Sequence, residues 1–175
     1  MLEKRLDGRV KLLNHLKLLK KHKLSEFWIL TGHKGKGKSS TARGLLNFLS
    51  HHGYSYTTLE SENNSADILF LDDIARFFYK REFMTKQNRE FMKFIRLVRG
   101  VYLLILATVQ RWHDVDVDIR KDSDVIICHV VGPGIFIHPI IGVVVCNPNF
   151  DEDMSFRFKQ LEKAKEALKA SLGVI

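Results

Sequence analysis

The segment that most constrains the fold of this chain is residues 26–51, where the composition changes twice. Residues 26–31 read EFWILT, an apolar run with the length of a buried strand. Residues 32–39 read GHKGKGKS and combine three glycines with three lysines. Residues 38–51 carry apolar side chains at helical spacing, and Gly53 follows them as a stop signal. The sequence therefore predicts a strand, a glycine-rich basic loop and an amphipathic helix in direct succession.

The glycine-rich loop matches the pattern G-x-x-x-x-G-K-[ST], which binds phosphate. Glycines let the backbone aim its N–H groups inward, and the helix that follows adds partial positive charge at its N-terminus. Neighbouring lysines repel one another unless an anion offsets their charge, which argues against a basic turn without a ligand. We therefore expect the loop to bind ATP, with Lys38 at the β and γ phosphates and the Ser39 hydroxyl on Mg²⁺. The residues expected to hold the nucleotide are Gly32, His33, Lys34, Gly35, Lys36, Gly37, Lys38, Ser39 and Ser40.

A pair of aspartates ends the next strongly apolar run, ADILFLDD. Residues 68–71 predict a buried strand, and Asp72 and Asp73 stand at its C-terminal end, the edge at which open α/β sheets bind ligands. We expect Asp72 to orient the Mg²⁺ shell and Asp73 to polarise the attacking water, a role often filled by glutamate. A polar strand ending without chemistry is the alternative for this pair.

The run LLILATVQRW supplies another polar strand end. Thr108 and Gln110 would lie beside the γ-phosphate if this strand sits between strands 26–31 and 68–71, and Gln110 would then hold the water or detect cleavage. Otherwise Gln110 caps a strand end. His113 follows, but the eight histidines show no H-E-x-x-H or Cys/His spacing, so no zinc site is predicted.

Strands and helices alternate along the chain, which predicts an α/β fold with a mostly parallel sheet covered on both faces. An amphipathic helix is predicted over residues 2–22, and a turn at residues 132–134 is expected to lead into a hairpin. The apolar face of the first helix is expected to hold Leu2, Leu6, Val10, Leu13, Leu16 and Leu19. The remaining predicted elements are strands at 54–60, 101–108 and 124–131 and helices at 84–99 and 151–172.

The length of 175 residues fits one domain with a single main core. We expect that domain to comprise a basic N-terminal helix (1–23), a nucleotide-binding core (26–131) and a hairpin with a closing helix (132–175). The two cysteines, Cys128 and Cys146, are too few for a disulfide framework and predict reduced, buried thiols.

The net charge is +8, and the first 23 residues hold eight basic and two acidic side chains. Such an excess favours nucleic acid or anionic lipid as a partner, and a solvated helix face is the alternative. Residues 125–146 contain no Asp, Glu, Lys or Arg, but glycines and prolines interrupt this apolar run, so no membrane span is expected. Because the first 23 residues do not resemble a secretory signal, we expect a cytoplasmic setting, in the host if the source is viral.

The loop, the aspartate pair and the strand ending ATVQR together resemble P-loop ATPases of the additional-strand class. Residues 68–127 are similar to the FtsK/HerA group of DNA translocases and viral genome-packaging ATPases, including the Zot-like branch. The shared features are a Walker B strand, a basic helix, a strand ending in a Thr/Gln motif, and the segment D-x-x-I-R-x-x-x-D-x-I-I at residues 116–127. The resemblance covers residues 26–131.

This resemblance implies a three-layer α/β/α P-loop NTPase fold, with an N-terminal amphipathic helix and a C-terminal β-hairpin plus helix beside it. It also implies ATP and Mg²⁺ as cofactors, DNA as a partner and a homo-oligomeric ring. In such rings an arginine of one subunit reaches the γ-phosphate of its neighbour. The candidates are Arg81, Arg96, Arg99, Arg111 and Arg120, of which Arg111 and Arg120 are preferred as catalytic residues because they follow the strand with the Thr/Gln motif.

Two other families and one topological conflict stay open at this point. LFLDDIARFF followed by TKQNREFMKF also resembles the initiator and helicase-loader branch of AAA+ ATPases, whose helical lid has no room here. A small-molecule kinase shares the loop but needs a lid and an acceptor pocket, neither of which the sequence indicates. About seven residues join strands 54–60 and 68–71, which is too few for a parallel crossover. We therefore expect that pair to be antiparallel, or the first of the two strands to lie outside the main sheet.

Overall fold

The computed structural model describes residues 2–58, 65–74, 86–114, 121, 124–146, 165 and 173. Its helices are α1 (Leu2–His22), α2 (Lys38–His51), α3 (Lys86–Val98) and the short 3-10 helix η4 (Trp112–Asp114). Its strands are β1 (Glu26–Thr31), β2 (Tyr56–Thr58), β3 (Ile68–Leu71), β4 (Leu104–Thr108), β5 (Val125–Gly132), β6 (Ile135–His138) and β7 (Gly142–Val145). The predicted closing helix over residues 151–172 lies outside the described residues, apart from Lys165.

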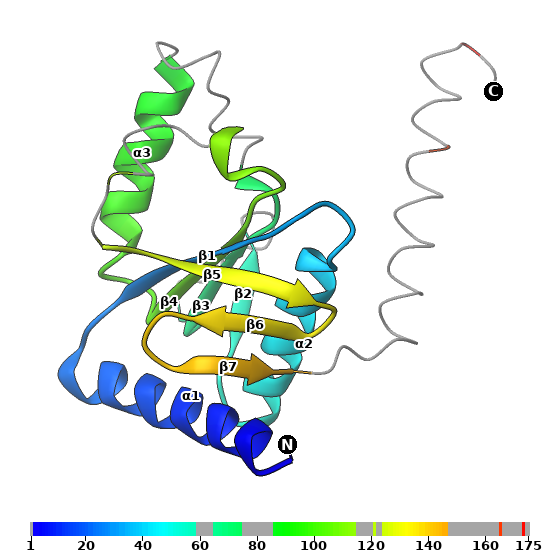
Figure 1. The fold of residues 1–175 in the computed structure, drawn as a ribbon. Coiled ribbons are helices and arrows are strands. Elements are labelled where there is room, and N and C mark those ends of the chain that lie inside the picture. The colour runs from blue at the N-terminus through cyan, green and yellow to red at the C-terminus, as the bar shows by residue number, and fades with distance from the viewer. Residues whose placement is uncertain are drawn as a thin grey trace.

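The seven strands form one sheet in the order β2-β3-β4-β1-β5-β6-β7 (Figure 1). Neighbouring strands from β2 to β5 run parallel, and β6 and β7 extend the sheet as antiparallel strands. The predicted α/β fold with a mostly parallel sheet is confirmed. β4 lies between β1 and β3, which is the placement on which the prediction for Gln110 depended. Because parallel strands end at the same edge, the residues that follow β1, β3 and β4 meet there.

The pairing of β2 with β3 is parallel, with Tyr56 opposite Ile68, so the expectation of an antiparallel or outlying strand was wrong. Of the predicted strand over residues 54–60, residues 56–58 form β2, and residues 59–60 lie outside the described residues. A strand of the length of β2 rises only ~10 Å. Residues 59–67 could span ~30 Å if extended, which exceeds the ~10 Å needed to return along β2.

Alternate side chains of the central strands enter two hydrophobic cores. Trp28 and Leu30 of β1 lie in a core to which α1 and α2 contribute, whereas Phe27 and Ile29 lie in a second core that includes Ile95 of α3. This alternation is the period of two expected for a strand. Because both sets are apolar, the strand reads as a continuous hydrophobic run in the sequence.

α1 packs along β7 with much of the face that its leucine spacing predicted, since Leu16 and Leu19 are buried and Leu13 packs against the core. Leu12 and Leu16 are fully buried, whereas Val10, a predicted core residue, is 53% exposed. Gly8 faces the sheet beside Leu12, and a Cβ atom there would collide with the backbone carbonyl oxygen of Val143. Gly8, Leu12 and Leu16 lie at intervals of four and so share one face of the helix. A glycine permits this close approach of helix and strand.

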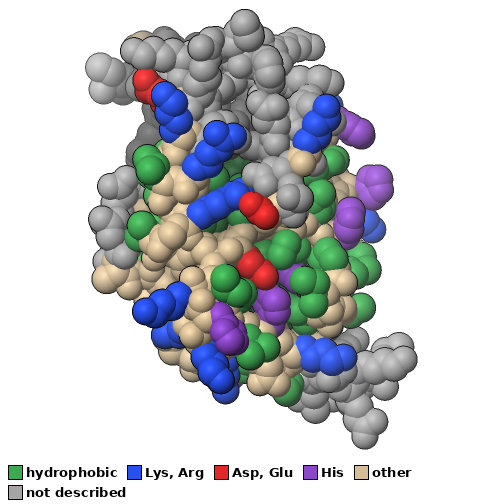
Figure 2. All heavy atoms as spheres, turned by 90° about the vertical axis from the view of Figure 1, so that its left-hand side faces the viewer, with side chains coloured by type: hydrophobic (Ala, Val, Ile, Leu, Met, Phe, Trp, Pro, Cys, Tyr) green, Lys and Arg blue, Asp and Glu red, His purple; other side chains and the backbone are tan. Residues whose placement is uncertain are grey.

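β5, β6 and β7 form two consecutive hairpins, which confirms the turn and hairpin predicted after residue 131. Hydrophobic side chains gather along one side of the face shown in Figure 2. The exposed apolar side chains of these strands and their turns are Val131, Ile137, Ile140 and Val143. Within the described residues, no helix has the length and apolar character needed to cross a membrane.

Both cysteines are free and buried, as the sequence predicted. Burial raises the pKa of both thiols, that of Cys146 to about 12 despite the opposing effect of Arg9. Thiolate is the reactive form of cysteine, so both side chains are expected to be inert in the folded protein.

A buried polar cluster joins α1, β1 and the β6–β7 turn. Trp28 Nε1 donates to Glu26 Oε2 at 2.7 Å, and the His15 ring lies 2.9 Å from the same carboxylate oxygen. His138, at 1% exposure, packs its ring against Trp28 with centroids 4.5 Å apart. Its Nδ1 accepts hydrogen bonds from the backbone N–H groups of Ile140 and Ile141 at 3.1 and 3.2 Å, so the neutral ring carries its proton on Nε2.

His138 is expected to make the fold less stable in acid. Burial lowers the pKa of His138 from 6.5 to about 4; Glu26 opposes this shift and His15 adds to it. The unfolded chain therefore takes up a proton near pH 6.5 that the folded chain resists until about pH 4, and stability is lost as the pH falls through this window. We expect roughly 2 kcal/mol of unfolding free energy to be lost this way, measured by urea unfolding at neutral and acidic pH.

The variant His138→Asn tests this assignment, because its side-chain oxygen can still accept from the two N–H groups but does not titrate. The loss of stability between neutral pH and about pH 4.5 should be clearly smaller in this variant than in the native chain. An equal loss in both proteins would assign the pH dependence to other groups.

Candidate phosphate-binding site

The loop between β1 and α2 closes around its own lysine. Lys38 is the first residue of α2, and its Nζ donates hydrogen bonds to the carbonyl oxygens of Gly32 at 3.0 Å and His33 at 3.1 Å. Gly35 and Gly37 have φ angles of 81° and 78°, in the left-handed region that favours glycine. These two turns explain why the loop needs glycine at both positions.

The Lys38 ammonium differs from the other two lysines of the loop. Lys34 and Lys36 have exposed side chains, whereas that of Lys38 is partly buried. Burial lowers the pKa of Lys38 from its ordinary value, and the Asp73 carboxylate acts in the opposite direction. Asp73 thus favours the charged form of the lysine, which is the form that binds an anion.

Hydrogen bonds join the first turn of α2 to the ends of β3 and β4. Ser39 Oγ donates to Asp72 Oδ1 at 3.3 Å, and the Thr108 hydroxyl donates to the same oxygen at 2.7 Å. The Thr108 oxygen in turn accepts from the backbone N–H of Asp73 at 2.8 Å. The Asp72 carboxylate is therefore fixed in front of α2 by a side chain from the neighbouring strand. This arrangement depends on β4 lying between β1 and β3.

Asp73 has an unusual backbone conformation, with a φ of 51°. Among residues other than glycine, aspartate and asparagine adopt this left-handed region most readily. The side chain lines a cavity beside the loop, and its Oδ1 is buried. The backbone geometry therefore suits aspartate at this position, in a role that is often filled by glutamate.

Thr41 connects the loop to the turn between β5 and β6. Its Oγ1 donates to the carbonyl oxygen of Gly37 at 2.7 Å and accepts from the N–H of Gly134 at 3.0 Å. Pro133 lies against Gly37, where an added Cβ would come within 3.2 Å of the proline Cα. The turn at residues 132–134 is thus one wall of the loop.

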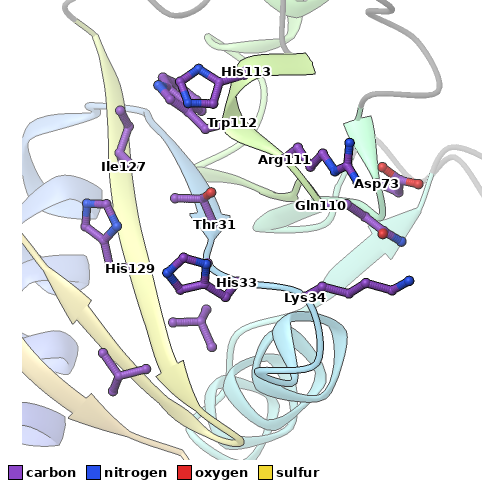
Figure 3. Close-up of a pocket in the computed structure, with 13 residues that line it drawn as sticks. Thr31, His33, Lys34, Asp73, Gln110, Arg111, Trp112, His113, Ile127 and His129 are labelled. Atoms are coloured by element: carbon purple, nitrogen blue, oxygen red, sulfur yellow. The ribbon is translucent and has the colours of Figure 1, made fainter.

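A cavity of about 1070 Å³ opens beside the loop at the same edge of the sheet. Figure 3 shows Gln110, Arg111 and Asp73 along one side of this cavity and Ile127 and His129 along the other. The other labelled residues that line it are Thr31, His33, Lys34, Trp112 and His113. The kinase alternative lacked an acceptor pocket in the sequence, and this cavity supplies space that the sequence did not indicate.

The structure brings together most of the residues singled out in the sequence. Lys38, Ser39, Asp72 and Asp73 meet at one edge, and Gln110 and Arg111 reach the cavity beside them. Ser40 is buried in the first turn of α2. Among the other arginines, Arg99 forms an ion pair with Asp124 at 3.3 Å, Arg96 is exposed on α3, and Arg81 and Arg120 lie outside the described residues.

Sequence reasoning missed the partners that hold these residues in place. Thr108, which was expected beside the γ-phosphate, binds Asp72 and the backbone of Asp73. Thr41 and Pro133 carried no signal, because their contacts join residues about ninety positions apart. Thr108 was found as a polar residue at a strand end, but its partners were not.

Comparison of the chain with models of protein families and with curated proteins finds no match. The chemistry of the site is therefore argued from the geometry of the described residues.

Proposed function

We propose that the chain is a three-layer α/β/α P-loop ATPase that couples hydrolysis of Mg-ATP to the translocation, packaging or remodelling of DNA. The observation that carries the proposal is the meeting of Lys38, Ser39 and the Asp72–Asp73 pair at one sheet edge, with Ser39 Oγ 3.3 Å from Asp72 Oδ1. A hydroxyl and a carboxylate oxygen side by side are suitable Mg²⁺ ligands. Their position at a glycine-rich helix start favours a phosphate-bound ion.

The loop would hold the phosphates through Lys38 and the N–H groups at the start of α2. On binding, Lys38 Nζ would exchange the neutral carbonyl oxygens of Gly32 and His33 for charged phosphate oxygens, which make stronger hydrogen bonds. Ser39 and Asp72 would hold Mg²⁺, which when bound draws charge from the phosphate oxygens. The hydrogen bond from Thr108 keeps Asp72 in the position that this role requires.

Asp73 would accept a proton from the attacking water, since it lines the cavity next to the loop. Gln110, on the same side of the cavity, would orient that water through its amide. Arg111 is exposed at the cavity, and we propose that it, or Arg120, reaches the γ-phosphate of a neighbouring copy in a homo-oligomeric ring. Under these assignments, each residue predicted to be catalytic or to bind the metal has a role in phosphoanhydride cleavage.

The charge distribution supports DNA as the partner. The net charge is +8, and α1 exposes four lysines, Lys11, Lys17, Lys20 and Lys21. Neutralising phosphates with such side chains releases counterions, which is the main source of affinity for nucleic acid at moderate salt. The basic helix would therefore hold DNA without reading its sequence.

Thr108→Val is expected to impair the site while keeping its shape. The valine fills the same volume but offers no hydroxyl, so Asp72 loses one hydrogen bond and the N–H of Asp73 loses its acceptor. We expect the unfolding free energy to fall by ~1–3 kcal/mol and ATP turnover to fall about tenfold. Thr108→Ser keeps the hydroxyl and should remain close to the native protein in both measurements. Equal turnover in the valine and serine variants would show that this hydroxyl has no part in catalysis.

The function is tested by ATP turnover with and without DNA, on protein whose mass in solution is measured. A motor predicts Mg²⁺-dependent hydrolysis that rises several-fold with added DNA, and a multimer. Turnover that is the same with duplex, single-stranded and no DNA would contradict the DNA part of the proposal. Transfer of phosphate to a nucleoside would instead favour a kinase, and capture of a replicative helicase would favour a loader.

A further inference from the structure

The cavity beside the loop reaches the proposed catalytic residues Asp73 and Gln110 on one side and extends beyond the phosphate cradle to β5 on the other. Of the residues of the loop, Gly32, His33 and Lys34 line it, while those from Gly35 to Ser39 do not. Asp72 is also absent from its lining. If ATP places its phosphates at Lys38 and Ser39, the volume of about 1070 Å³ in front of β1 and β5 is left for a second ligand. Typical ligand pockets have about 300–1,000 Å³, so the space is sufficient for one.

The lining of this cavity is cationic and aromatic. Lys34 and Arg111 bring positive charge, and in the described part of the chain neither side chain has a hydrogen bond or ion pair. Among the described residues that line the cavity, Asp73 is the one carboxylate. The half-buried indole of Trp112 adds a flat apolar surface. The imidazoles that line the cavity belong to His33, His113 and His129.

The placement of these groups matches one nucleotide of a nucleic-acid strand, which carries a flat base and a charged phosphate. Trp112 and His113 lie on the short helix η4, while Ile127 and His129 come from β5 across the cavity (Figure 3). A base can stack on an indole and rest against an aliphatic wall, and a phosphate can then reach Lys34 or Arg111. A purely apolar ligand would leave the two cations without a counter-charge, and a bare anion would make no use of the indole.

We propose that this cavity binds a nucleobase and its phosphate from a single strand of nucleic acid, with Trp112 as the stacking surface. The inference rests on the proposed function in one respect, which is that the ATP phosphates occupy the loop and not the cavity. The proposal narrows the expected partner from DNA in general to an unpaired strand, because a base inside a duplex cannot present its flat face to the indole.

Binding is measured by the anisotropy of a labelled oligothymidylate of about eight nucleotides, with the full chain and no ATP. Trp112→Leu and Arg111→Ala should each weaken binding about tenfold, and Arg111→Ala should also reduce the slope of log affinity against log salt by about one. Lys38→Ala should bind the oligonucleotide as the native chain does, although it should lose ATP. Lys93→Ala, an exposed lysine on α3, is the matched charge control and should bind normally.

The two tryptophans allow a second measurement on the same samples. Trp28 is fully buried, so quenching of the intrinsic fluorescence by a ligand in the cavity reports on Trp112. The oligonucleotide should quench the native chain and not Trp112→Leu, and the remaining Trp28 emission shows that the variant is folded. If free nucleotide alone quenches the fluorescence, and Lys38→Ala abolishes that quenching, the base of ATP occupies the cavity. The proposed site for a single strand would then be wrong. Equal oligonucleotide affinity of Trp112→Leu and the native chain would also overturn it, whereas the ATPase proposal would stand.

Discussion

Lys38→Ala is expected to weaken ATP binding at least ~100-fold and to remove measurable turnover. The native ammonium is held inside the loop by the carbonyl oxygens of Gly32 and His33, at 3.0 and 3.1 Å, and Asp73 favours its charge. Losing charge-assisted hydrogen bonds to phosphate of about 3 kcal/mol corresponds to this factor. Calorimetry with a nonhydrolysable ATP analogue and Mg²⁺ measures the affinity directly.

The same substitution removes two hydrogen bonds within the loop, so its effect on folding must be known. We expect the unfolding free energy to fall by ~1–2 kcal/mol, which leaves the chain folded at room temperature. Lys93→Ala removes a lysine from the exposed side of α3 and should leave nucleotide affinity unchanged. Tight ATP binding by Lys38→Ala would show that the loop does not act as a phosphate cradle.

Asp73→Asn is expected to slow hydrolysis by ~10²–10⁴ while nucleotide affinity changes little. The amide cannot accept a proton from water, but it has the size of the carboxylate. Asparagine also tolerates the left-handed backbone at this position, where φ is 51°, so the substitution changes the chemistry and preserves the geometry. Single-turnover hydrolysis together with analogue binding separates the two quantities.

Two further variants test whether the slower hydrolysis comes from the loss of the catalytic base. Asp73→Ala should lose ~1–2 kcal/mol of stability in addition, because alanine is strained at this φ. Asp124→Asn makes the same chemical change at an exposed carboxylate that pairs with Arg99, and both activity and stability should stay near native. A fully active Asp73→Asn would assign proton removal to another group.

The parts of the site that were predictable from the sequence are those that depend on local sequence patterns. A strand, a glycine-rich loop and a helix follow one another directly, so Lys38 and Ser39 could be placed from sequence alone. Asp72, Asp73 and Gln110 could be placed because parallel strands end at a common edge. No spacing rule, however, fixed the strand order, and the position of β4 next to β1 had to come from the structure.

The errors came from long-range packing. On α1, Val10 is exposed and Leu12 is buried, on the side where Gly8 lies against Val143. The connection before β3 looked too short for a parallel pair, yet Tyr56 to Thr58 of β2 pair in parallel with β3. Thr108 was recognised as a polar strand end, but its partner Asp72 lies 36 positions away, beyond the reach of periodicity.

The contacts of Thr41 and Pro133 link the glycine-rich loop to the β5–β6 turn, so the two segments together form one split sequence motif. A substitution at Pro133 or Gly134 alters the space available to Gly37 as directly as a substitution in the loop would. Chains related to this one should therefore be sought with a split pattern, in which G-x-x-x-x-G-K-S-x-T is followed, after a long and variable interval, by the glycine–proline–glycine turn. We expect residues of the loop and of the turn to co-vary among such chains, so that a larger residue in one segment is accompanied by a smaller residue in the other.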